Sequence, residues 1–279
     1  MKISKDKTTA FFGRWFLTIL VAFTVLFPLY WIFISSITPK QMLFGSPIHY
    51  IPQATTFENY IDLFLKLDIG TKTLNTFIIT FFALAFSTML CLAAAYAFAR
   101  YKSRGLNIAF GLILFSALLP GIVAARPLYD FMRATRLLDT YQGLIILYIS
   151  GLIPFTMLIL YNSISQIPIS IEEAAETDGA NFFQKVFYII LPLMRPAVAI
   201  IAIINFITCL NDLFTPLFYS HKIEVLSLGI TTIPRESSYQ LPWDKISTMG
   251  WYMIFPVIIF VVIFEKHIME GIMAGGVKQ

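Results

Sequence analysis

Residues 74–99, LNTFIITFFALAFSTMLCLAAAYAFA, contain no charged side chain and few polar ones. A helix needs about 20 mostly apolar residues to cross the roughly 30 Å hydrocarbon core of a bilayer, so this stretch predicts a transmembrane helix. Five further stretches pass the same test: residues 15–34, 106–125, 143–162, 197–219 and 246–264. Asp212 is the only formally charged side chain among the six. The sequence therefore predicts an all-α integral membrane protein with six transmembrane helices.

The composition of the chain agrees with this prediction. Of its 279 residues, 58% are hydrophobic and 13% are charged, whereas soluble domains carry about 25% charged residues. This balance excludes a soluble globular enzyme and a disordered chain. Cys91 and Cys209 lie inside apolar stretches, where neither a disulfide framework nor a cysteine metal site is expected. We attribute the net charge of +4 to basic residues that flank the membrane helices, and we expect no nucleic-acid partner.

Basic residues outside the six stretches indicate the orientation. Two dense groups belong in the cytoplasm by the positive-inside rule: Lys2, Lys5, Lys7 and Arg14, and Arg100, Lys102 and Arg104. We therefore expect a cytoplasmic N-terminus (residues 1–14), a membrane domain (15–264) and a cytoplasmic tail (265–279), with the first stretch retained as an anchor. Three arginines of the third connection argue against this orientation: Arg126, Arg133 and Arg136.

The fourth connection, residues 165–196, is long, polar and cytoplasmic in this topology. It begins SQIPISIEEAAETDGANFFQKVFYIILP. Ser170 is the expected N-cap of a first helix with acidic residues in its first turn, and Gly179 can end that helix because glycine adopts a positive φ. Asn181 is the expected cap of a second helix that carries its apolar residues on one side, and Pro192 then breaks the path into the fifth span. The pattern predicts two short helices joined by a glycine bend.

On these features alone, the fourth connection has two interpretations. It is either an amphipathic hairpin at the membrane surface or a docking element for a cytoplasmic partner. The acidic first helix favours docking, because an anionic leaflet repels carboxylates.

The same connection resembles the EAA signature of ABC-importer permeases. The matching positions are Glu173-Ala174-Ala175, three residues, Gly179, nine residues, and Ile189-x-Leu191-Pro192. Other stretches resemble the carbohydrate subgroup of maltose-type permeases: residues 27–31, 94–97, 139–140, 211–212 and 271–278. The resemblance implies the fold of a type I ABC importer permease.

The resemblance also implies how such a chain works. The first helix of the connection would be a coupling helix seated in a cleft of a separate ATPase subunit, with Glu173 paired to a basic ATPase residue. The implied coupling residues are Glu172, Glu173, Ala174, Ala175, Asp178, Gly179, Ala180, Leu191 and Pro192. The tail would add a contact through Gly275, Gly276 and Lys278. The implied partners are a second homologous permease, two ABC ATPases that carry ATP and Mg, an extracytoplasmic solute-binding protein and membrane lipid.

No catalytic pattern accompanies these features. The chain has no G-x-x-x-x-G-K-[ST] motif, no Ser-His-Asp arrangement and no metal-ligand spacing. Its histidines, His49, His221 and His267, lie in connections or beyond the last span. We expect a non-catalytic subunit that binds no cofactor or metal itself, located in the cytoplasmic (inner) membrane of a bacterium or archaeon.

Polar and aromatic residues at membrane depth are candidates for the substrate pathway. They are Asn205, Asn211, Asp212, Tyr148, Phe155 and Tyr219. Asn211 and Asp212 fit interhelical hydrogen bonding equally well. We also expect Pro120-Gly121 and Pro154 to bend the third and fourth spans, because such bends often open cavities. The arginines of the third connection are either ordinary surface charge or a contact for an anionic glycan or an acidic binding protein.

The predicted function is that of a permease subunit that imports a carbohydrate, in particular an oligosaccharide, by alternating access driven by separate ATPases. One alternative within the family is import of an anionic sugar or a sugar-phosphate ester. A second is a secondary transporter that works alone, which would need an ionisable relay within the membrane. A third is a membrane scaffold that presents a cytoplasmic helix.

Overall fold

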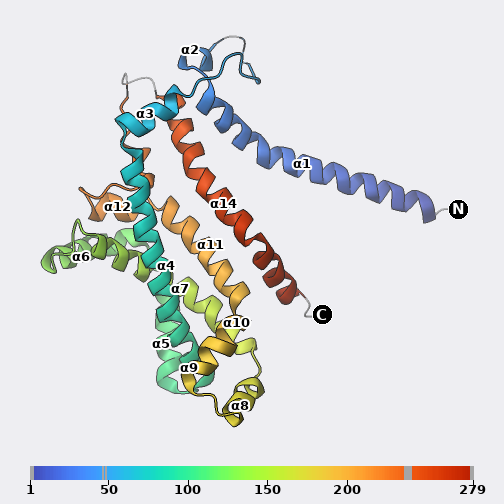
Figure 1. Ribbon diagram of the computed structural model, residues 1–279, viewed down its shortest axis with the longest axis vertical. Helices are drawn as coiled ribbons and strands as arrows, with labels where there is room; N and C mark the ends of the chain where they lie inside the picture. The colour runs from blue at the N-terminus through green and yellow to red at the C-terminus, as the bar shows by residue number, and fades with distance from the viewer. Residues whose placement is uncertain (1–2, 46, 48, 236–240, 277–279) are drawn as a thin grey trace. The chain divides into compact units, whose positions relative to one another are not determined.

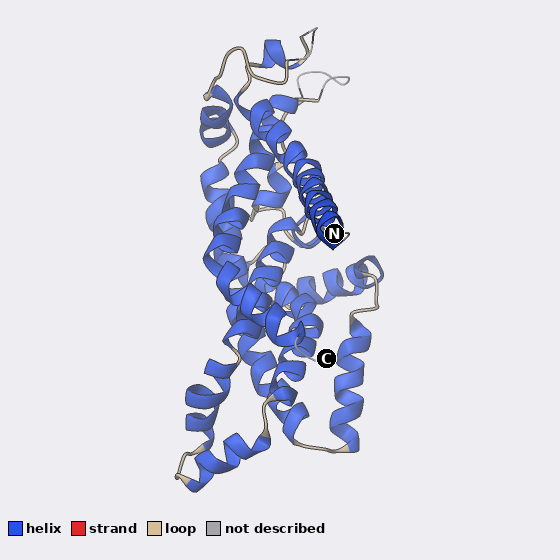
Figure 2. Cartoon of the chain, turned by 90° about the vertical axis from the view of Figure 1, so that its right-hand side faces the viewer, coloured by secondary structure: helices blue, strands red, loops and turns tan. Residues whose placement is uncertain are grey.

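The computed structural model describes residues 3–45, 47, 49–235 and 241–276. Over this range the chain is helical and contains no strand (Figure 2). Figure 1 labels most of the elements. They are α1 (Ile3–Ile37), α2 (Lys40–Leu43), α3 (Glu58–Lys66), α4 (Ile69–Arg100), α5 (Arg104–Ser116), α6 (Gly121–Ala134), α7 (Tyr141–Gln166), α8 (Ile169–Thr177), α9 (Phe182–Lys185), the π-helix η1 (Val186–Ile190), α10 (Leu191–Leu193), α11 (Arg195–Asn211), α12 (Phe214–Tyr219), α13 (Leu226–Gly229) and α14 (Trp243–Gly276).

Contacts divide the chain into two compact units: Met1–Ile69 with Gly229–Phe255, and Gly70–Leu228 with Pro256–Gln279. In the first unit, hydrogen bonds join the end of α1 to α3 and to the start of α14. The Ser36 hydroxyl pairs with the Tyr60 hydroxyl at 2.8 Å, and the Ser36 carbonyl oxygen accepts from Asn59 and Thr248, each at 3.2 Å. These polar groups satisfy one another within the protein, as apolar surroundings require.

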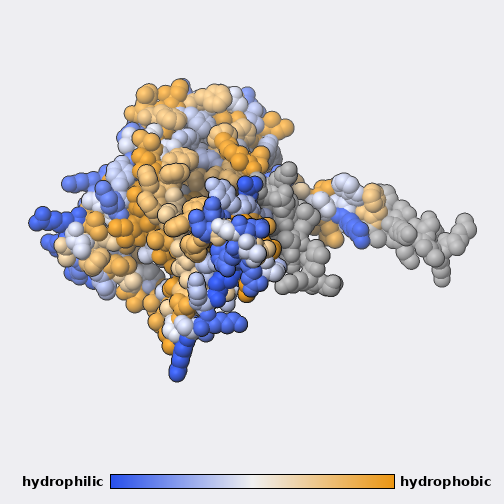
Figure 3. Space-filling view, turned by 60° about the horizontal axis from the view of Figure 1, so that its bottom comes forward, coloured by the Kyte–Doolittle hydropathy of each residue, from blue (hydrophilic) through white to orange (hydrophobic). Residues whose placement is uncertain are grey.

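Within the part of the chain that the structure describes, four helices are long and apolar enough to cross a membrane: Gly13–Ile37, Ile69–Arg100, Tyr141–Gln166 and Trp243–Glu265. They confirm the spans predicted at residues 15–34, 74–99, 143–162 and 246–264. Large apolar side chains on these helices are exposed, including Phe16 (67%) and Met89 (71%), and apolar residues cover broad areas of the surface (Figure 3). A helix that faces lipid needs such a surface.

The third span, predicted over residues 106–125, is bent at Pro120-Gly121, as expected. α5 ends at Ser116, α6 begins behind Pro120, and the two helices are bent by 103°. Proline has no N–H to continue the helical hydrogen bonds, and its ring disfavours helical backbone in the residue before it. Helix α6 continues into the following connection as far as Ala134.

The fifth span, predicted over residues 197–219, is also broken. α11 ends at Asn211, because Asp212 is extended (φ −72°, ψ 112°). The Asp212 Oδ1 accepts the backbone N–H of Phe214 at 3.0 Å and that of Thr215 at 3.4 Å, which starts α12. A short acidic side chain that binds backbone donors ahead of it favours a helix start over a helix interior. Two bent helix pairs are apolar enough to count as one span each, α5 with α6 and Phe182–Leu193 with α11, and with them the described chain has up to six spans.

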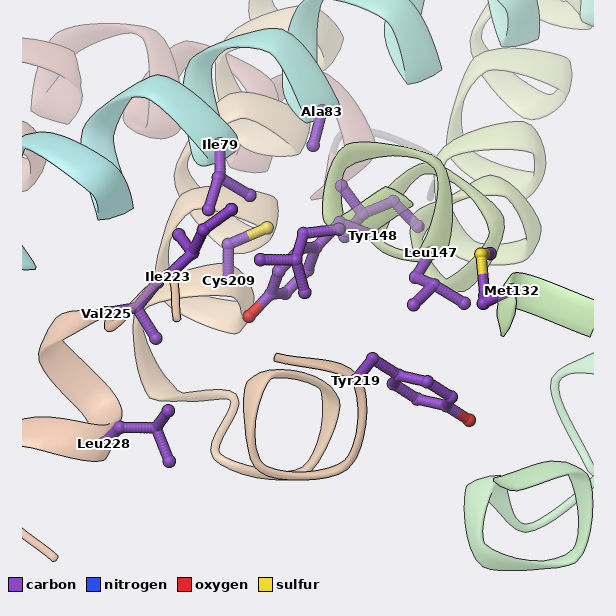
Figure 4. Close-up of a cluster of buried hydrophobic side chains, with 12 residues drawn as sticks. Ile79, Ala83, Met132, Leu147, Tyr148, Cys209, Tyr219, Ile223, Val225 and Leu228 are labelled. Atoms are coloured by element: carbon purple, nitrogen blue, oxygen red, sulfur yellow. The ribbon is translucent and has the colours of Figure 1, made fainter. Parts of the chain in front are cut away.

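Two clusters of buried apolar side chains hold the second unit together. The first, drawn in Figure 4, joins α4, α6, α7, α11 and α12. The second joins α4, α7, η1 and α11. Cys209 lies in the first cluster and Cys91 in the second, both as free thiols. Because α4 and α7 contribute to both clusters, they form the frame from which the connection between α7 and α11 extends.

Asp139 fixes the loop between α6 and α7 to the segment after α12. Its backbone has a φ of +58°, and its Oδ1 accepts the backbone N–H groups of His221 and Lys222, the latter at 3.0 Å. Burial raises the pKa of this carboxyl, but the two N–H groups outweigh burial and hold the pKa below its usual value. The loop is therefore stabilised by the ionised form of Asp139.

Candidate functional site

The connection between α7 and α11 contains the candidate coupling helix, α8. This helix begins at Ile169 behind Pro168, whose backbone is extended (φ −58°, ψ 134°). The prediction that Ser170 caps the helix is wrong, because Ser170 lies within the first turn and no side chain caps the N-terminus. The fixed φ and missing N–H of proline suit the position at which a chain enters a helix.

The end of α8 is a glycine-dependent bend, as predicted. Gly179 has a φ of +85°. Its N–H donates to the Glu176 carbonyl oxygen at 3.0 Å, and the Ala180 N–H donates to the Ala175 carbonyl oxygen at 2.9 Å. This pair of bonds is a Schellman motif, which satisfies the last carbonyl groups of a helix and reverses the chain. The bend directs the chain from α8 into α9.

The two faces of α8 differ in exposure. Glu172 and Ala175 are buried, at 4% and 8% exposure, and they lie one turn apart on the same face. Glu173, Ala174 and Asp178 are exposed. The helix therefore exposes the carboxylate of Glu173, and the cap residue Asp178 exposes a second one, while Glu172 and Ala175 pack within the chain.

Glu172 binds the end of α4. Arg100 Nε donates to Glu172 Oε1 at 2.7 Å, and Arg100 Nη2 lies 2.6 Å from the same oxygen. The Tyr96 hydroxyl donates to Glu172 Oε2 at 2.8 Å. Arg100 Nη2 also donates to the carbonyl oxygen of Ile167, which ends α7, at 3.1 Å. Both oxygens of Glu172 are thus bound inside the chain, and the sequence analysis did not predict these partners.

The second half of the connection confirms the cap predicted at Asn181. The Asn181 side chain accepts the N–H of Gln184 at 2.9 Å, and the Gln184 side chain accepts the N–H of Asn181 at 2.8 Å, which is a capping box. Lys185, 7% exposed, donates to Glu176 of α8. The two short helices of the connection are thereby joined to each other.

The second helix is α-helical only in its first turn, α9, and continues as the π-helix η1. Ile190 is fully buried and Val186 half-buried, but Phe183 and Phe187 are 69% and 56% exposed. The π-helix η1 explains the difference, because its wider turn shifts the register at which side chains repeat. An α-helical repeat therefore does not describe residues 182–193.

The exit from the connection bends as predicted. Leu191 and Pro192 are half-buried, and the helical stretch that contains them is bent by 72° from α11. Pro192 and Pro196 lie on either side of this bend. The bend turns the chain from the connection into the fifth span.

The structure does not bring all six predicted pathway residues together, although it places the Tyr148 side chain of α7 beside the Asp212 carboxylate. Asn205, 1% exposed, donates to the Thr156 hydroxyl of α7 at 2.8 Å, which is an interhelical hydrogen bond. Tyr148 and Tyr219 lie in the first buried cluster, where the Tyr219 hydroxyl donates to the Ala125 carbonyl oxygen at 3.2 Å (Figure 4).

The remaining three candidates are distributed differently. Asp212 uses its carboxylate to start α12, and its backbone carbonyl oxygen accepts from Ser227 at 2.7 Å. Asn211 and Phe155 are exposed. These positions fit interhelical bonding and helix capping better than a common binding pocket.

An open groove of about 600 Å³ lies elsewhere in the second unit. It is bounded by α4, the end of the coupling connection, α11 and α14, and its aromatic side chains include Phe77, Phe81, Phe206 and Phe260. Thr80 supplies a hydroxyl among them. The sequence analysis missed this groove, because aromatic residues are so frequent in the chain that none of them stands out.

The other predicted positions are dispersed. Gly275 and Gly276 form the end of α14, and Lys278 lies outside the described residues. Arg126, Arg133 and Arg136 are exposed, and Arg126 pairs with Asp130 at 3.0 Å. Among the described residues, no group of three or more His, Cys, Asp or Glu side chains is placed to hold a metal ion.

Comparison with known proteins gives consistent matches. The model of the family described as binding-protein-dependent transport system inner membrane component matches residues 90–265, a segment that contains α8. The trehalose transport system permease protein of Mycobacterium tuberculosis (strain CDC 1551 / Oshkosh) is 31% identical over 94% of this chain and 95% of that protein. The sulfoquinovosyl glycerol transport system permease protein of Agrobacterium fabrum is 28% identical over 91% and 89%.

A solved structure is similar over nearly the whole chain. It is that of a bacterial ABC transporter involved in the import of the acidic polysaccharide alginate, and one of its chains matches with a TM-score of 0.79 and 25% sequence identity. The match covers 95% of this chain and 98% of that chain.

Proposed function

We propose that this chain, which belongs to the binding-protein-dependent transport system inner membrane components, is the membrane-spanning permease of an ABC importer for a carbohydrate. Its membership confirms the resemblance to ABC-importer permeases and the helical fold expected from it. The names of similar proteins, which refer to trehalose, sulfoquinovosyl glycerol and alginate, support a carbohydrate as the substrate.

The proposal for energy coupling rests on the exposed face of α8. Glu173 is exposed on α8 and Asp178 directly after the helix, while Glu172 and Ala175 are buried within the chain. A short helix held rigidly at its back and acidic at its front can seat in a basic cleft of another protein. In this proposal Glu173 pairs with a basic residue of the ATPase, and ATP-driven motion of the ATPases moves α8.

The same proposal fixes the assembly. The chain works with a second homologous permease, two ABC ATPases that bind ATP and Mg, and an extracytoplasmic binding protein, in a bacterial or archaeal cytoplasmic membrane. The chain itself hydrolyses no ATP. Its N- and C-termini lie in the cytoplasm, with Gly275, Gly276 and Lys278 as a second contact for the ATPases. The binding protein is supported by the description of the family as binding-protein-dependent.

The test is co-purification of the ATPase with the chain from membranes. Glu173→Lys reverses an exposed charge on α8, and Glu58→Lys makes the same change at an exposed position on α3. The proposal predicts that wild type and Glu58→Lys retain the ATPase and that Glu173→Lys releases it. Equal retention by all three would show that α8 does not dock the ATPase, and absence of the ATPase from wild type would refute the assembly.

An anionic glycan is a second candidate substrate. Arg126, Arg133 and Arg136 are exposed, and a similar solved transporter imports an acidic polysaccharide. Replacing the three arginines with glutamine should slow uptake of an anionic oligosaccharide and leave uptake of a neutral one unchanged. Unchanged uptake of both would assign the arginines to ordinary surface charge.

A secondary transporter that works alone is less consistent with the described residues. Asp212 is the only carboxylate within the predicted spans, and its Oδ1 accepts backbone N–H groups at the start of α12. A proton or ion relay needs several ionisable groups that exchange their partners.

A further inference from the structure

The end of α4 contacts the coupling connection through a set of residues that the proposed ATPase contact does not use. We call Tyr96, Arg100 and Glu172, with the carbonyl group of Ile167, the Arg100 network. The hydrogen bonds within it measure 2.7 to 3.1 Å. The Tyr96 ring also lies edge-on to the ring of Phe182 in α9, with centroids 5.5 Å apart. One turn of α4 is therefore bound to the end of α7, to α8 and to α9.

This network is buried. The side chains of Arg100 and Glu172 are 10% and 6% exposed. Two charges that have left water attract each other strongly, and separating them would leave each one buried without a partner. A charge-assisted bond of this kind resists separation far more than an exposed ion pair. Displacing α8 away from α4 is thus unfavourable, while displacing the two helices together keeps every bond.

The other ion pair of α8 has different surroundings. Glu176 binds Lys185, but the Glu176 side chain is 59% exposed and its partner belongs to α9 of the same connection. Water weakens such a pair, and it joins α8 only to its own neighbour in sequence. Among the described residues, the Arg100 network contains the ion pair that joins α8 to a long apolar helix.

Neighbouring residues of α8 consequently have different roles in the proposed transmission. Consecutive side chains on a helix point about 100° apart, so Glu172 and Glu173 cannot face the same way. Glu172 faces α4 and Glu173 faces outward. The outward residue can receive a displacement from a partner, and the inward residue can transmit it.

We infer that the Arg100 network transmits the displacement of α8 to α4, with Tyr96, Arg100 and Glu172 as positioning residues of the transport cycle. This inference rests on the proposed function, because the displacement originates at the ATPase. It adds to that function a transmission path inside the chain, formed by residues far apart in the sequence.

The first experiment needs no ATPase. Hydrogen exchange is measured over residues 169–177 in the purified chain, as wild type, Arg100→Gln and the charge-exchanged pair Arg100→Glu with Glu172→Arg. Arg100→Gln should exchange about tenfold faster over this helix, the change expected when a charge-assisted hydrogen bond is lost. Tyr96→Phe, which preserves the ring and removes one hydrogen bond, should show a smaller increase. Unchanged exchange in Arg100→Gln would overturn the network.

The second experiment separates transmission from a merely structural role. The assembled importer is reconstituted in vesicles, and sugar uptake is divided by ATP hydrolysed. Arg100→Gln should retain the ATPase and its hydrolysis, but transport about tenfold less sugar per ATP, by the same loss of one charge-assisted bond. The charge-exchanged pair should recover part of that ratio. Glu176→Gln is the matched control on α8 and should leave the ratio near the wild-type value.

The outcomes distinguish the two proposals. A ratio of sugar to ATP that stays unchanged in Arg100→Gln would overturn transmission through the network, even if the ATPase binds normally. Failure of wild type to bind the ATPase would refute the proposed function and the transmission role with it, whereas the exchange experiment would still decide whether the network holds α8 to α4.

Discussion

Replacing Gly179 with alanine should destabilise the bend after α8 through the backbone alone. Gly179 has a φ of +85°, and a Cβ added there would meet no atom within 4 Å beyond its chain neighbours. Left-handed backbone costs an L-residue about 1–2 kcal/mol. Alanine also restricts the unfolded chain, which returns about 0.4–1 kcal/mol. We expect a net loss of about 1 kcal/mol, or roughly a fivefold decrease in the population of the bend.

Hydrogen exchange over residues 169–180 of the purified chain measures this effect. Gly179→Ala should exchange about fivefold faster than wild type, since exchange follows the population of open conformers. Gly179→Asn is the control and should exchange less rapidly than alanine, because asparagine tolerates left-handed backbone. Gly179→Pro should have the largest effect, because it removes the N–H that donates to Glu176 and fixes φ near −65°.

Two results would refute this reasoning. Equal exchange of the alanine and asparagine variants would show that the positive φ is not what these substitutions disturb. Wild-type exchange in Gly179→Pro would show that the bend after α8 does not depend on the conformation of this residue.

Three further predictions concern the frame that holds the connection. A Cβ at Gly143 would lie 2.0 Å from a backbone carbonyl oxygen. Gly143→Ala should therefore lower the free energy of unfolding, measured by thermal unfolding, by about 3 kcal/mol. The control Gly151→Ala, in open space on the same helix, should be neutral or stabilising in the same assay. Because the pKa of Asp139 is lowered in the folded chain, its stabilisation is present above its unfolded pKa of about 3.9 and is lost as pH falls through the folded value. Asp139→Asn should therefore be less stable than wild type at pH 7, with a difference that shrinks below about pH 4, and a constant difference would contradict this. Asn205→Leu should destabilise the chain by about 1–3 kcal/mol, because the Thr156 hydroxyl loses its partner. If Asn205 instead serves the substrate pathway and not this hydrogen bond, the substitution would alter uptake and leave stability unchanged.

The sequence could predict the membrane spans where each helix continues unbroken. Mean hydropathy detects apolar composition but not continuity, so it gives no sign of the break within residues 197–219, whereas Pro120 does indicate the bend within residues 106–125. The breaks depend on Pro120 and on the capping of Asp212, which act on one or two peptide groups within an otherwise apolar run.

Only part of the coupling connection could be predicted, because only part of it depends on local sequence signals. Local signals identified Gly179 and Asn181, because each acts on backbone groups within three residues of itself. The partners of Glu172 could not be predicted, since Arg100 precedes it by 72 residues and only the packing of α4 against α8 brings them together. An arginine that ends a long apolar stretch was the available signal, and it was read as an indicator of topology alone.

The central claim is that the exposed face of α8 docks an ATPase, and thiol cross-linking tests it most directly. Both native cysteines are buried, so a cross-linker reaches an introduced thiol preferentially. Single cysteines would be placed by Glu173→Cys and Thr177→Cys on the exposed face, and by Ala175→Cys on the buried face. We predict cross-links to the ATPase from the two exposed positions and none from the buried one. Cross-links from neither exposed position, or equally from all three, would contradict the assignment of α8 as the coupling helix.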